Sequence, residues 1–168
     1  MEQFDILDKS GNPTGFTAGK GTCLHAGQYY LGTHAYIFNM SMEFLIQQRA
    51  LSKEFLPGGW DVHLEHAIAG ETSVECVIRG LKEEIGLIVT EANICSSDRF
   101  VWEDYNHIID VYFIQTSFGI DELILHREEV IDVKFISLDE MRVLVSNINY
   151  RPREYAQLVL SQIKCLTS

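Results

Sequence analysis

Residues 70–87 read GETSVECVIRGLKEEIGL, and the spacing of acidic, basic and aliphatic residues in this stretch is the most informative pattern in the chain. Thr72 and Glu75 fit a capping box, and Gly86 supplies a C-terminal stop. A helix is therefore predicted between these signals. At about 100° per residue, its core face is expected to carry Val74, Val77, Ile78, Leu81 and Ile85.

The opposite face of this helix is expected to be polar. Cys76, Gly80, Glu83 and Glu84 fall on it, with Arg79 at its edge. Residues three and four apart are neighbours on a helix, so Glu83 and Glu84 flank the position above Gly80. Clustered carboxylates repel each other, and a divalent cation that prefers oxygen ligands, such as Mg²⁺ or Mn²⁺, offsets this repulsion. For a glutamate pair taken alone, a solvated acidic face is the alternative.

The order Glu71, Arg79, Glu83, Glu84 and Gly86, with its intervening spacing, is similar to the signature of the Nudix hydrolases, G-x5-E-x7-R-E-U-x-E-E-x-G-U, where U is a bulky aliphatic residue. The resemblance implies cleavage of nucleoside diphosphates linked to another moiety, or of similar diphosphates, with a divalent metal. It also implies roles for four catalytic candidates. Glu83 and Glu84 would bind the metal, one of them being linked to water activation. Arg79 would orient a glutamate, and Glu71 would structure the junction between loop and helix.

Two positions depart from the Nudix signature. Glu65 stands where the signature opens with glycine, and Gly80 replaces the first glutamate of its R-E-U-x-E-E core. Glycine inside a helix costs about 1 kcal/mol relative to alanine, so stability does not explain Gly80. Either the site binds less metal, or another acid replaces the missing glutamate, or the protein has lost catalysis. A glutamate restored at position 80 is expected to strengthen the metal site and to stabilise the helix.

Two acids outside the helix are further candidate metal ligands. Glu65 is the nearest replacement for the missing carboxylate, because the loop of residues 60–71 carries it close to the helix start. Its alternative is a solvent-exposed loop acid. Nudix enzymes often draw another glutamate from a loop on the far side of the sheet, and Glu129, just before a predicted strand, fits that place. Its alternative is an exposed acidic turn.

Segments outside the motif resemble a Nudix subgroup related to isopentenyl-diphosphate isomerase. They include FDILDKSGNPTG at residues 4–15 and LHAGQYYLGTHAYIF at residues 24–38. The isomerases themselves use a cysteine in the loop after a tryptophan and a segment with paired glutamates. The loop after Trp60 has no cysteine, and residues 106–110 read NHIID. Hydrolysis is therefore favoured over isomerisation.

Strand-like segments precede and follow the motif helix, which is typical of an α+β layered domain. With the resemblance, this order implies a Nudix fold, a mixed β-sheet sandwiched between helices, as a single domain over residues 1–168. Strands are predicted at residues 4–8, 14–18, 34–39, 43–47, 60–62, 100–102, 107–116 and 132–137, and further helices at 138–145 and 151–163.

The composition indicates a soluble globular protein, with 46% hydrophobic and 22% charged residues. No apolar run approaches the roughly 20 residues of a membrane span, and no signal peptide is visible. The net charge of −11 argues against a nucleic-acid polymer as partner, although a bound metal would still permit a small phosphorylated substrate. The four cysteines lack paired spacing and are expected to stay reduced in a cytoplasm.

The sequence therefore predicts a metal-dependent hydrolase of a small organic diphosphate, nucleoside or related, that uses Mg²⁺ or Mn²⁺. The alternative, raised by Gly80, is a catalytically weakened Nudix-fold protein that binds a nucleotide or diphosphate. Substrate identity does not follow from the sequence, because specificity lies in loops and strand faces outside the motif. The oligomeric state does not follow either, and a homodimer stays open.

Overall fold

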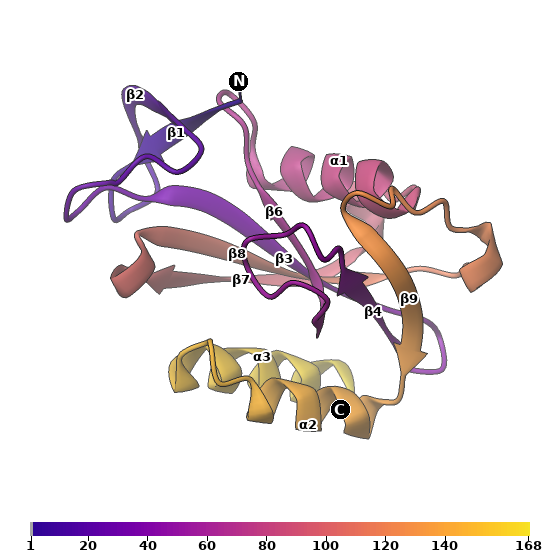
Figure 1. Ribbon diagram of the computed structural model, residues 1–168. Helices are drawn as coiled ribbons and strands as arrows, with labels where there is room; N and C mark the ends of the chain where they lie inside the picture. Colours follow the sequence, from indigo (N-terminus) through magenta and orange to yellow (C-terminus); the bar gives the residue numbers. More distant parts are fainter. Residues whose placement is uncertain (1) are drawn as a thin grey trace.

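This computed structural model describes residues 2–168, in which a run of strands precedes the first α-helix, further strands follow it, and two helices come last. The motif helix α1 lies between β6 and β7, so strands flank it on both sides, as the sequence predicts (Figure 1). The elements are β1 (Gln3–Leu7), β2 (Pro13–Gly19), β3 (Tyr30–Phe38), β4 (Phe44–Arg49), β5 (Trp60–Asp61), β6 (His63–His66), α1 (Ser73–Ile85), β7 (Ile94–Trp102), β8 (His107–Gln115), β9 (Val130–Ile136), α2 (Leu138–Asn147) and α3 (Arg153–Leu166).

The main sheet is mixed and is built around β3. This strand runs parallel to β8 and antiparallel to β4 and β6. The strands β5 and β9 pair with β4, and β7 pairs with β8, all antiparallel. β1 and β2 form a separate two-stranded sheet. The motif helix therefore faces a sheet whose central strand also contacts β6, the strand that precedes it.

Helices cover both faces of the main sheet, with α1 on one side and α2 and α3 on the other (Figure 1). Successive side chains of a strand point to opposite faces. Along β3, Ala35 and Ile37 accordingly join the cluster that contains the core face of α1, whereas Tyr36 and Phe38 join the cluster of α2 and α3. The predicted α+β fold, a mixed sheet sandwiched between helices, is confirmed. No helix among residues 2–168 is long and apolar enough to cross a membrane.

Helix α1 begins and ends where its sequence signals predict. The Thr72 hydroxyl accepts a hydrogen bond from the Glu75 backbone N–H at 3.3 Å, and the Glu75 carboxylate accepts one from the Thr72 N–H at 2.8 Å. This reciprocal pair is a capping box. Gly86 ends the helix in the left-handed conformation, with φ of 69°.

The segment after Trp60 differs from its prediction. Residues His63–His66, expected to be part of a loop, form strand β6 and pair antiparallel with β3. The polar sequence HLEH gives no strand signal. The segment nevertheless forms a strand, because pairing with the central strand β3 satisfies its backbone hydrogen-bonding groups whatever its side chains are. Glu65 therefore lies on a strand, opposite Thr33, and not on a solvent-exposed loop.

The face of α1 that was expected to be polar is largely covered, so the alternative of a solvated acidic face does not hold for most of it. Cys76 and Gly80 are buried, and Glu84 is only 8% exposed. The reason is that α1 packs against both β3 and β6, so this face of the helix contacts protein and not solvent. Glu83 alone of the four predicted polar-face residues points outward, with 60% of its side chain exposed. Burial of a carboxylate at Glu84 requires partners, which the site provides.

A buried ion pair connects the C-terminal segment to the strand that leads into β6. Arg151 Nη2 donates to Asp61 Oδ2 at 2.6 Å, and the Tyr150 hydroxyl donates to the same oxygen at 2.9 Å. Both members of the ion pair are almost completely buried. This contact fixes β5, and hence the start of β6, against the layer that holds α3.

Candidate active site

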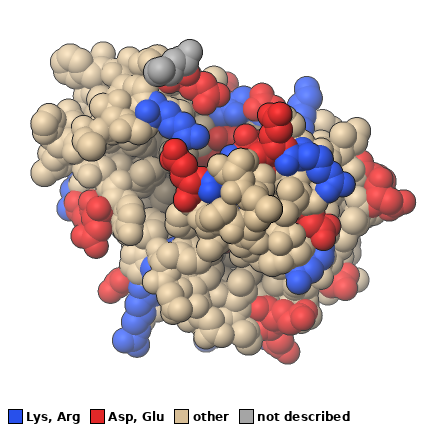
Figure 2. Space-filling view, viewed as in Figure 1, with Lys and Arg blue, Asp and Glu red and all other residues tan. Residues whose placement is uncertain are grey.

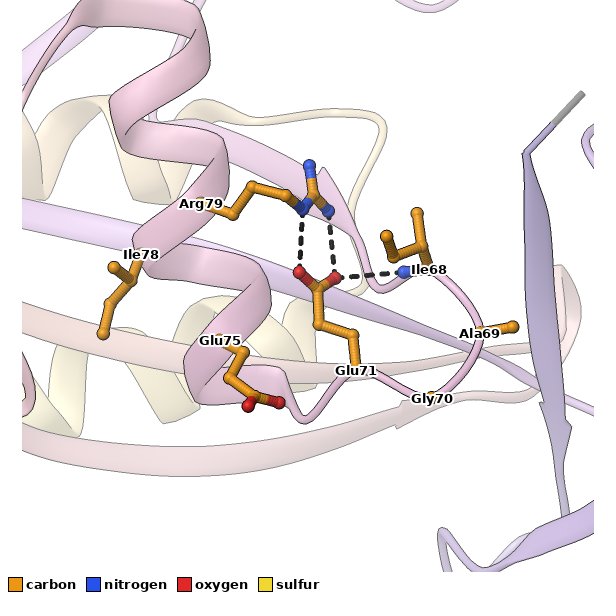
Figure 3. Close-up of a pocket in the computed structure, with 7 residues that line it drawn as sticks. All are labelled: Ile68, Ala69, Gly70, Glu71, Glu75, Ile78 and Arg79. Atoms are coloured by element: carbon orange, nitrogen blue, oxygen red, sulfur yellow. Dashed lines mark hydrogen bonds and ion pairs between the residues drawn. The ribbon is translucent and has the colours of Figure 1, made fainter.

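Arg79 and Glu71 form a two-bond ion pair at the start of α1. Arg79 Nε and Nη2 donate to the two carboxylate oxygens of Glu71 at 2.7 and 3.0 Å (Figure 3). Glu71 also accepts the Ile68 backbone N–H at 3.1 Å, which ties the preceding loop to the helix. The hydrogen bonds from the Arg79 guanidinium to Glu71 raise the pKa of Arg79, so its positive charge is secure.

The third guanidinium nitrogen of Arg79 reaches two further carboxylates. Nη1 lies 3.1 Å from Glu83 Oε2, one helical turn along α1. The same nitrogen lies 3.5 Å from Glu65 Oε2, on β6. Arg79 therefore gathers acids from the loop, the helix and the strand around a single positive group.

Glu84 is held by the sheet and by β6. Its Oε2 accepts a hydrogen bond from Gln47 Nε2 on β4 at 3.0 Å and lies 3.2 Å from His63 Nδ1. Burial acts to raise the pKa of Glu84, but the contacts with His63 and Gln47 and the nearby charge of Lys53 outweigh it. The pKa of Glu84 is lowered as a result, so this buried carboxylate stays ionised.

The space beside Gly80 is filled from β6. A Cβ built at position 80 would lie 2.7 Å from His63 Nε2 and 3.0 Å from Glu65 Oε2. His63 is 1% exposed, so its ring has little room to move away. The expectation that a glutamate restored at position 80 would stabilise the helix is therefore wrong, because an existing side chain already occupies the volume.

Glu65 brings a carboxylate to the place that Gly80 leaves without one. Its Oε2 faces the Gly80 backbone and also lies near Arg79, and its side chain is 21% exposed. Burial raises the pKa of Glu65, with His63 and Arg79 acting in the opposite direction. Of the three explanations that the sequence leaves open for Gly80, this geometry favours substitution by another acid.

Glu129 lies just before β9, and its carboxylate forms an ion pair with Lys53. Its loop contacts the end of the motif helix, because the His126 N–H donates to the Glu84 carbonyl at 2.8 Å. Burial lowers the pKa of the Lys53 ammonium, and the negative charges of Glu84 and Glu65 act in the opposite direction. Glu129 is thus neutralised by a lysine in this structure, and its role as a metal ligand stays a prediction.

The chemistry of the donor groups fits a divalent cation, although the protein does not enclose one by itself. No three His, Cys, Asp or Glu side chains among residues 2–168 converge closely enough to hold a metal ion. His63 Nε2, however, is buried without a hydrogen-bond partner in this part of the chain, and it shares the space beside Gly80 with Glu65. Mg²⁺ is commonly bound through one or two carboxylates, water and substrate phosphates. The arrangement suits a cation that substrate oxygens help to hold.

An open groove of about 510 Å³ follows the start of α1. Its lining comes from the loop before the helix and from Glu75, Ile78 and Arg79 (Figure 3). On the face shown in Figure 2, acidic and basic side chains gather around a recess in the upper part of the molecule. The groove gives a small ligand access to the Arg79 side of the site, and neither Glu83 nor Glu84 lines it.

Three residues of this site were not singled out from the sequence: His63, Gln47 and Lys53. Gln47 lies within a predicted strand, where period-two alternation identifies a face but not a partner. The signal that points to His63 is the combined replacement at positions 65 and 80. When a large side chain is absent from a buried helix position, a neighbouring residue is expected to fill the volume.

The chain belongs to the NUDIX family, because the NUDIX domain matches residues 29–159. An uncharacterised Nudix hydrolase of Listeria monocytogenes is 31% identical over 153 residues, which cover 90% of this chain and 89% of the relative. An isopentenyl-diphosphate Delta-isomerase of Citrobacter koseri is 26% identical over 145 residues, which cover 82% and 78%. The predicted resemblance to both groups is confirmed, with the higher identity on the hydrolase side.

A solved structure supports the fold independently. A crystal structure of a Deinococcus radiodurans protein superposes with a TM-score of 0.71 and covers 95% of this chain and 98% of its own. Only 15% of the aligned residues are identical, so the likeness establishes the fold and carries no information about substrate.

Proposed function

We propose that this protein is a metal-dependent hydrolase of a small organic diphosphate, nucleoside or related, in which Glu65 replaces the carboxylate missing at position 80. The observation that carries the proposal is the position of Glu65 Oε2, 3.0 Å from the point where a Cβ of residue 80 would stand. Glu83 and Glu84 supply the other two carboxylates from α1. Membership of a hydrolase family supports the reaction class.

The residues of the site divide the work between binding and orientation. Glu65, Glu83 and Glu84 would supply carboxylate ligands to Mg²⁺ or Mn²⁺, with water and substrate oxygens completing the ligand set. The metal, when bound, would neutralise diphosphate charge and lower the pKa of an attacking water. Arg79 fixes Glu83 and Glu65 from one side, and Gln47 fixes Glu84 from the other. One of these carboxylates accepts the proton that water loses as it attacks phosphorus.

The charge distribution supports a small substrate and not a polymer. The net charge of −11 repels an extended polyanion, whereas a diphosphate needs only local positive charge. Arg79 and Lys53 provide such charge beside the carboxylates. We therefore expect a soluble diphosphate as the ligand, with no role for a nucleic-acid polymer or a membrane surface.

A phosphate-release screen over nucleoside and isoprenoid diphosphates, run with Mg²⁺ and with Mn²⁺, tests the proposal. At least one compound should be hydrolysed in a metal-dependent manner, and Glu83→Gln/Glu84→Gln should abolish that activity. Glu91→Gln, at an exposed acid outside the site, is the control and should match wild type. Hydrolysis that survives both the double substitution and EDTA would overturn the assignment.

A second function, binding without turnover, is favoured by one observation. The carboxylates already have protein partners: Arg79 for Glu83, Gln47 for Glu84 and Lys53 for Glu129. A protein of this kind would bind a nucleotide or diphosphate as a sensor or partner module. In the same screen it would show ligand-dependent thermal stabilisation and no phosphate release with either metal.

A further inference from the structure

Gln47 is a buried polar residue at a strand position where alternation predicts an aliphatic one. It lies on β4, two residues after Leu45, so the two side chains point to the same face of the sheet. Leu45 belongs to the hydrophobic cluster that contains the core face of α1. Gln47 is only 3% exposed. A buried amide costs free energy unless it is hydrogen-bonded, so its presence calls for a physical reason.

The hydrogen bond that the Gln47 side chain makes in the described part of the chain goes to Glu84. Gln47 Nε2 donates to Glu84 Oε2 at 3.0 Å, and His63 Nδ1 lies 3.2 Å from the same oxygen. The backbone of Gln47 is paired on both sides, with Asp61 on β5 and with Val133 on β9. The amide is therefore presented to Glu84 from a rigid part of the sheet.

The two oxygens of the Glu84 carboxylate have different surroundings. Oε2 contacts Gln47 and His63, whereas Oε1 has no hydrogen-bond partner in the part of the chain that the structure describes. Because Oε1 is neither hydrogen-bonded nor fully buried, it is accessible to solvent. Glu71 differs, since each of its two oxygens accepts a hydrogen bond from Arg79. Glu84 therefore has one oxygen held by protein and one oxygen free to bind a cation.

Holding one oxygen of a carboxylate restricts the way in which that carboxylate binds a metal. Binding through both oxygens is common for Ca²⁺, which accepts many ligands in a flexible geometry. Mg²⁺ is smaller, demands near-ideal octahedral geometry and keeps several waters. An occupied Oε2 on Glu84 therefore disfavours the two-oxygen geometry that suits the larger ion.

We propose that Gln47 is the positioning residue of Glu84: it holds Oε2, so that Glu84 binds the cation through Oε1 alone and the site favours Mg²⁺ over Ca²⁺. The inference rests on the proposed function, because it concerns the same cation and one of its carboxylate ligands. It adds a residue that lies outside the motif of residues 70–87 and acts through Glu84 without touching the metal.

Infrared difference spectra of the EDTA-treated protein, with and without saturating Mg²⁺, test the binding mode without using activity. With glutamate labelled by ¹³C, the bands that Mg²⁺ shifts and that Glu84→Gln removes belong to Glu84. In wild type its antisymmetric and symmetric carboxylate stretches should be widely separated, as for binding through one oxygen. Gln47→Met keeps the approximate volume of the side chain and removes the donor, so this separation should narrow.

Calorimetric titration measures the consequence for affinity. Gln47→Met should lower Mg²⁺ affinity by about 10- to 100-fold and Ca²⁺ affinity by less, so the ratio of Ca²⁺ to Mg²⁺ affinity should rise. A merely structural role would lower both affinities equally. Gln48→Met is the matched control, because Gln48 is the next residue on β4 and its amide donates to the Gly58 carbonyl at 3.0 Å. This control should match wild type in its spectrum and in both affinities.

The outcomes separate this inference from the proposed function. Mg²⁺ bound in wild type with the narrow separation of two-oxygen binding would overturn the role of Gln47 and leave the proposed metal site in place. The same conclusion follows if Gln47→Met changes neither the spectrum nor the affinity ratio. A wild-type protein that binds no Mg²⁺ would remove both proposals. If urea unfolding shows that Gln47→Met does not fold, Gln47→Asn, whose amide is one methylene shorter, takes its place with the same expected results.

Discussion

Gly80→Ala is expected to destabilise the wild-type protein and to stabilise a His63→Ala variant. In an open helix position, alanine is better than glycine by about 0.8–1.0 kcal/mol. In wild type the new Cβ would lie 2.7 Å from His63 Nε2, in a site where the ring is 1% exposed. Overpacking of this kind costs about 1–3 kcal/mol. The free energy of unfolding should therefore fall by up to about 2 kcal/mol in wild type.

Removing the ring should reverse the sign of this effect. With alanine at position 63 the contact with the buried ring is gone. The remaining short contact of the new Cβ, 2.9 Å to Glu65 Cγ, involves a flexible side chain that can shift into the space left by the ring. Gly80→Ala should then raise the free energy of unfolding by up to about 1 kcal/mol. The coupling between the two substitutions is then about 1–3 kcal/mol, as for residues in direct contact. Urea unfolding in EDTA measures this coupling for wild type, Gly80→Ala, His63→Ala and the double variant. Unchanged m-values check that the four proteins can be compared as two-state unfolders.

A matched control is available on α3. Ser161→Ala is exposed and lies in another layer, so its effect should be the same with and without the His63 ring, within about 0.5 kcal/mol. If Gly80→Ala stabilises both backgrounds equally, then His63 does not fill the space beside Gly80. The account in which side chains of β6 fill the volume that Gly80 leaves on α1 would then be wrong.

Three further outcomes are expected. Arg151→Ala should lower the free energy of unfolding by about 3–5 kcal/mol, because it leaves the buried Asp61 carboxylate without its ion-pair partner. Arg142→Ala, which breaks an exposed ion pair, should change it by less than about 1 kcal/mol. Urea unfolding compares the two variants. Because the pKa of Glu84 is lowered from its ordinary value of 4.5, the stability it contributes is present above that pH and is lost as the pH falls below it. The free energy of unfolding of Glu84→Gln should therefore fall less steeply in acid than that of wild type. Equal slopes of unfolding free energy against pH would contradict this prediction. Filter binding should detect no useful affinity for duplex DNA at physiological salt, and tight, salt-sensitive binding would refute this prediction.

The sequence is a reliable guide where the signals are local. The capping residues Thr72 and Glu75 and the stop at Gly86 define α1, because each acts on backbone groups within one turn of itself. Hydrophobic periodicity likewise identifies Val77 and Leu81 as core residues. The motif also contains the acids and the arginine that the structure brings together.

The sequence is a poor guide where contacts are non-local. Strand β6 has a polar sequence and exists because it pairs with β3, about thirty residues earlier in the chain. The burial of Glu84 and the position of His63 both follow from that pairing. The helix pattern alone places Gly80 on a polar surface, and only the neighbouring strand shows that this surface is covered.

Substitution of Glu65 tests the central claim most directly, namely that its carboxylate does the work of the one missing at position 80. The assay is metal-dependent hydrolysis of a diphosphate identified in the screen, compared for wild type, Glu65→Gln and the control Glu91→Gln, with unfolding curves to confirm that each is folded. The account predicts a rate about a hundredfold or more below wild type for Glu65→Gln, and an unchanged rate for the control. A folded Glu65→Gln protein that hydrolyses the substrate at the wild-type rate would contradict it.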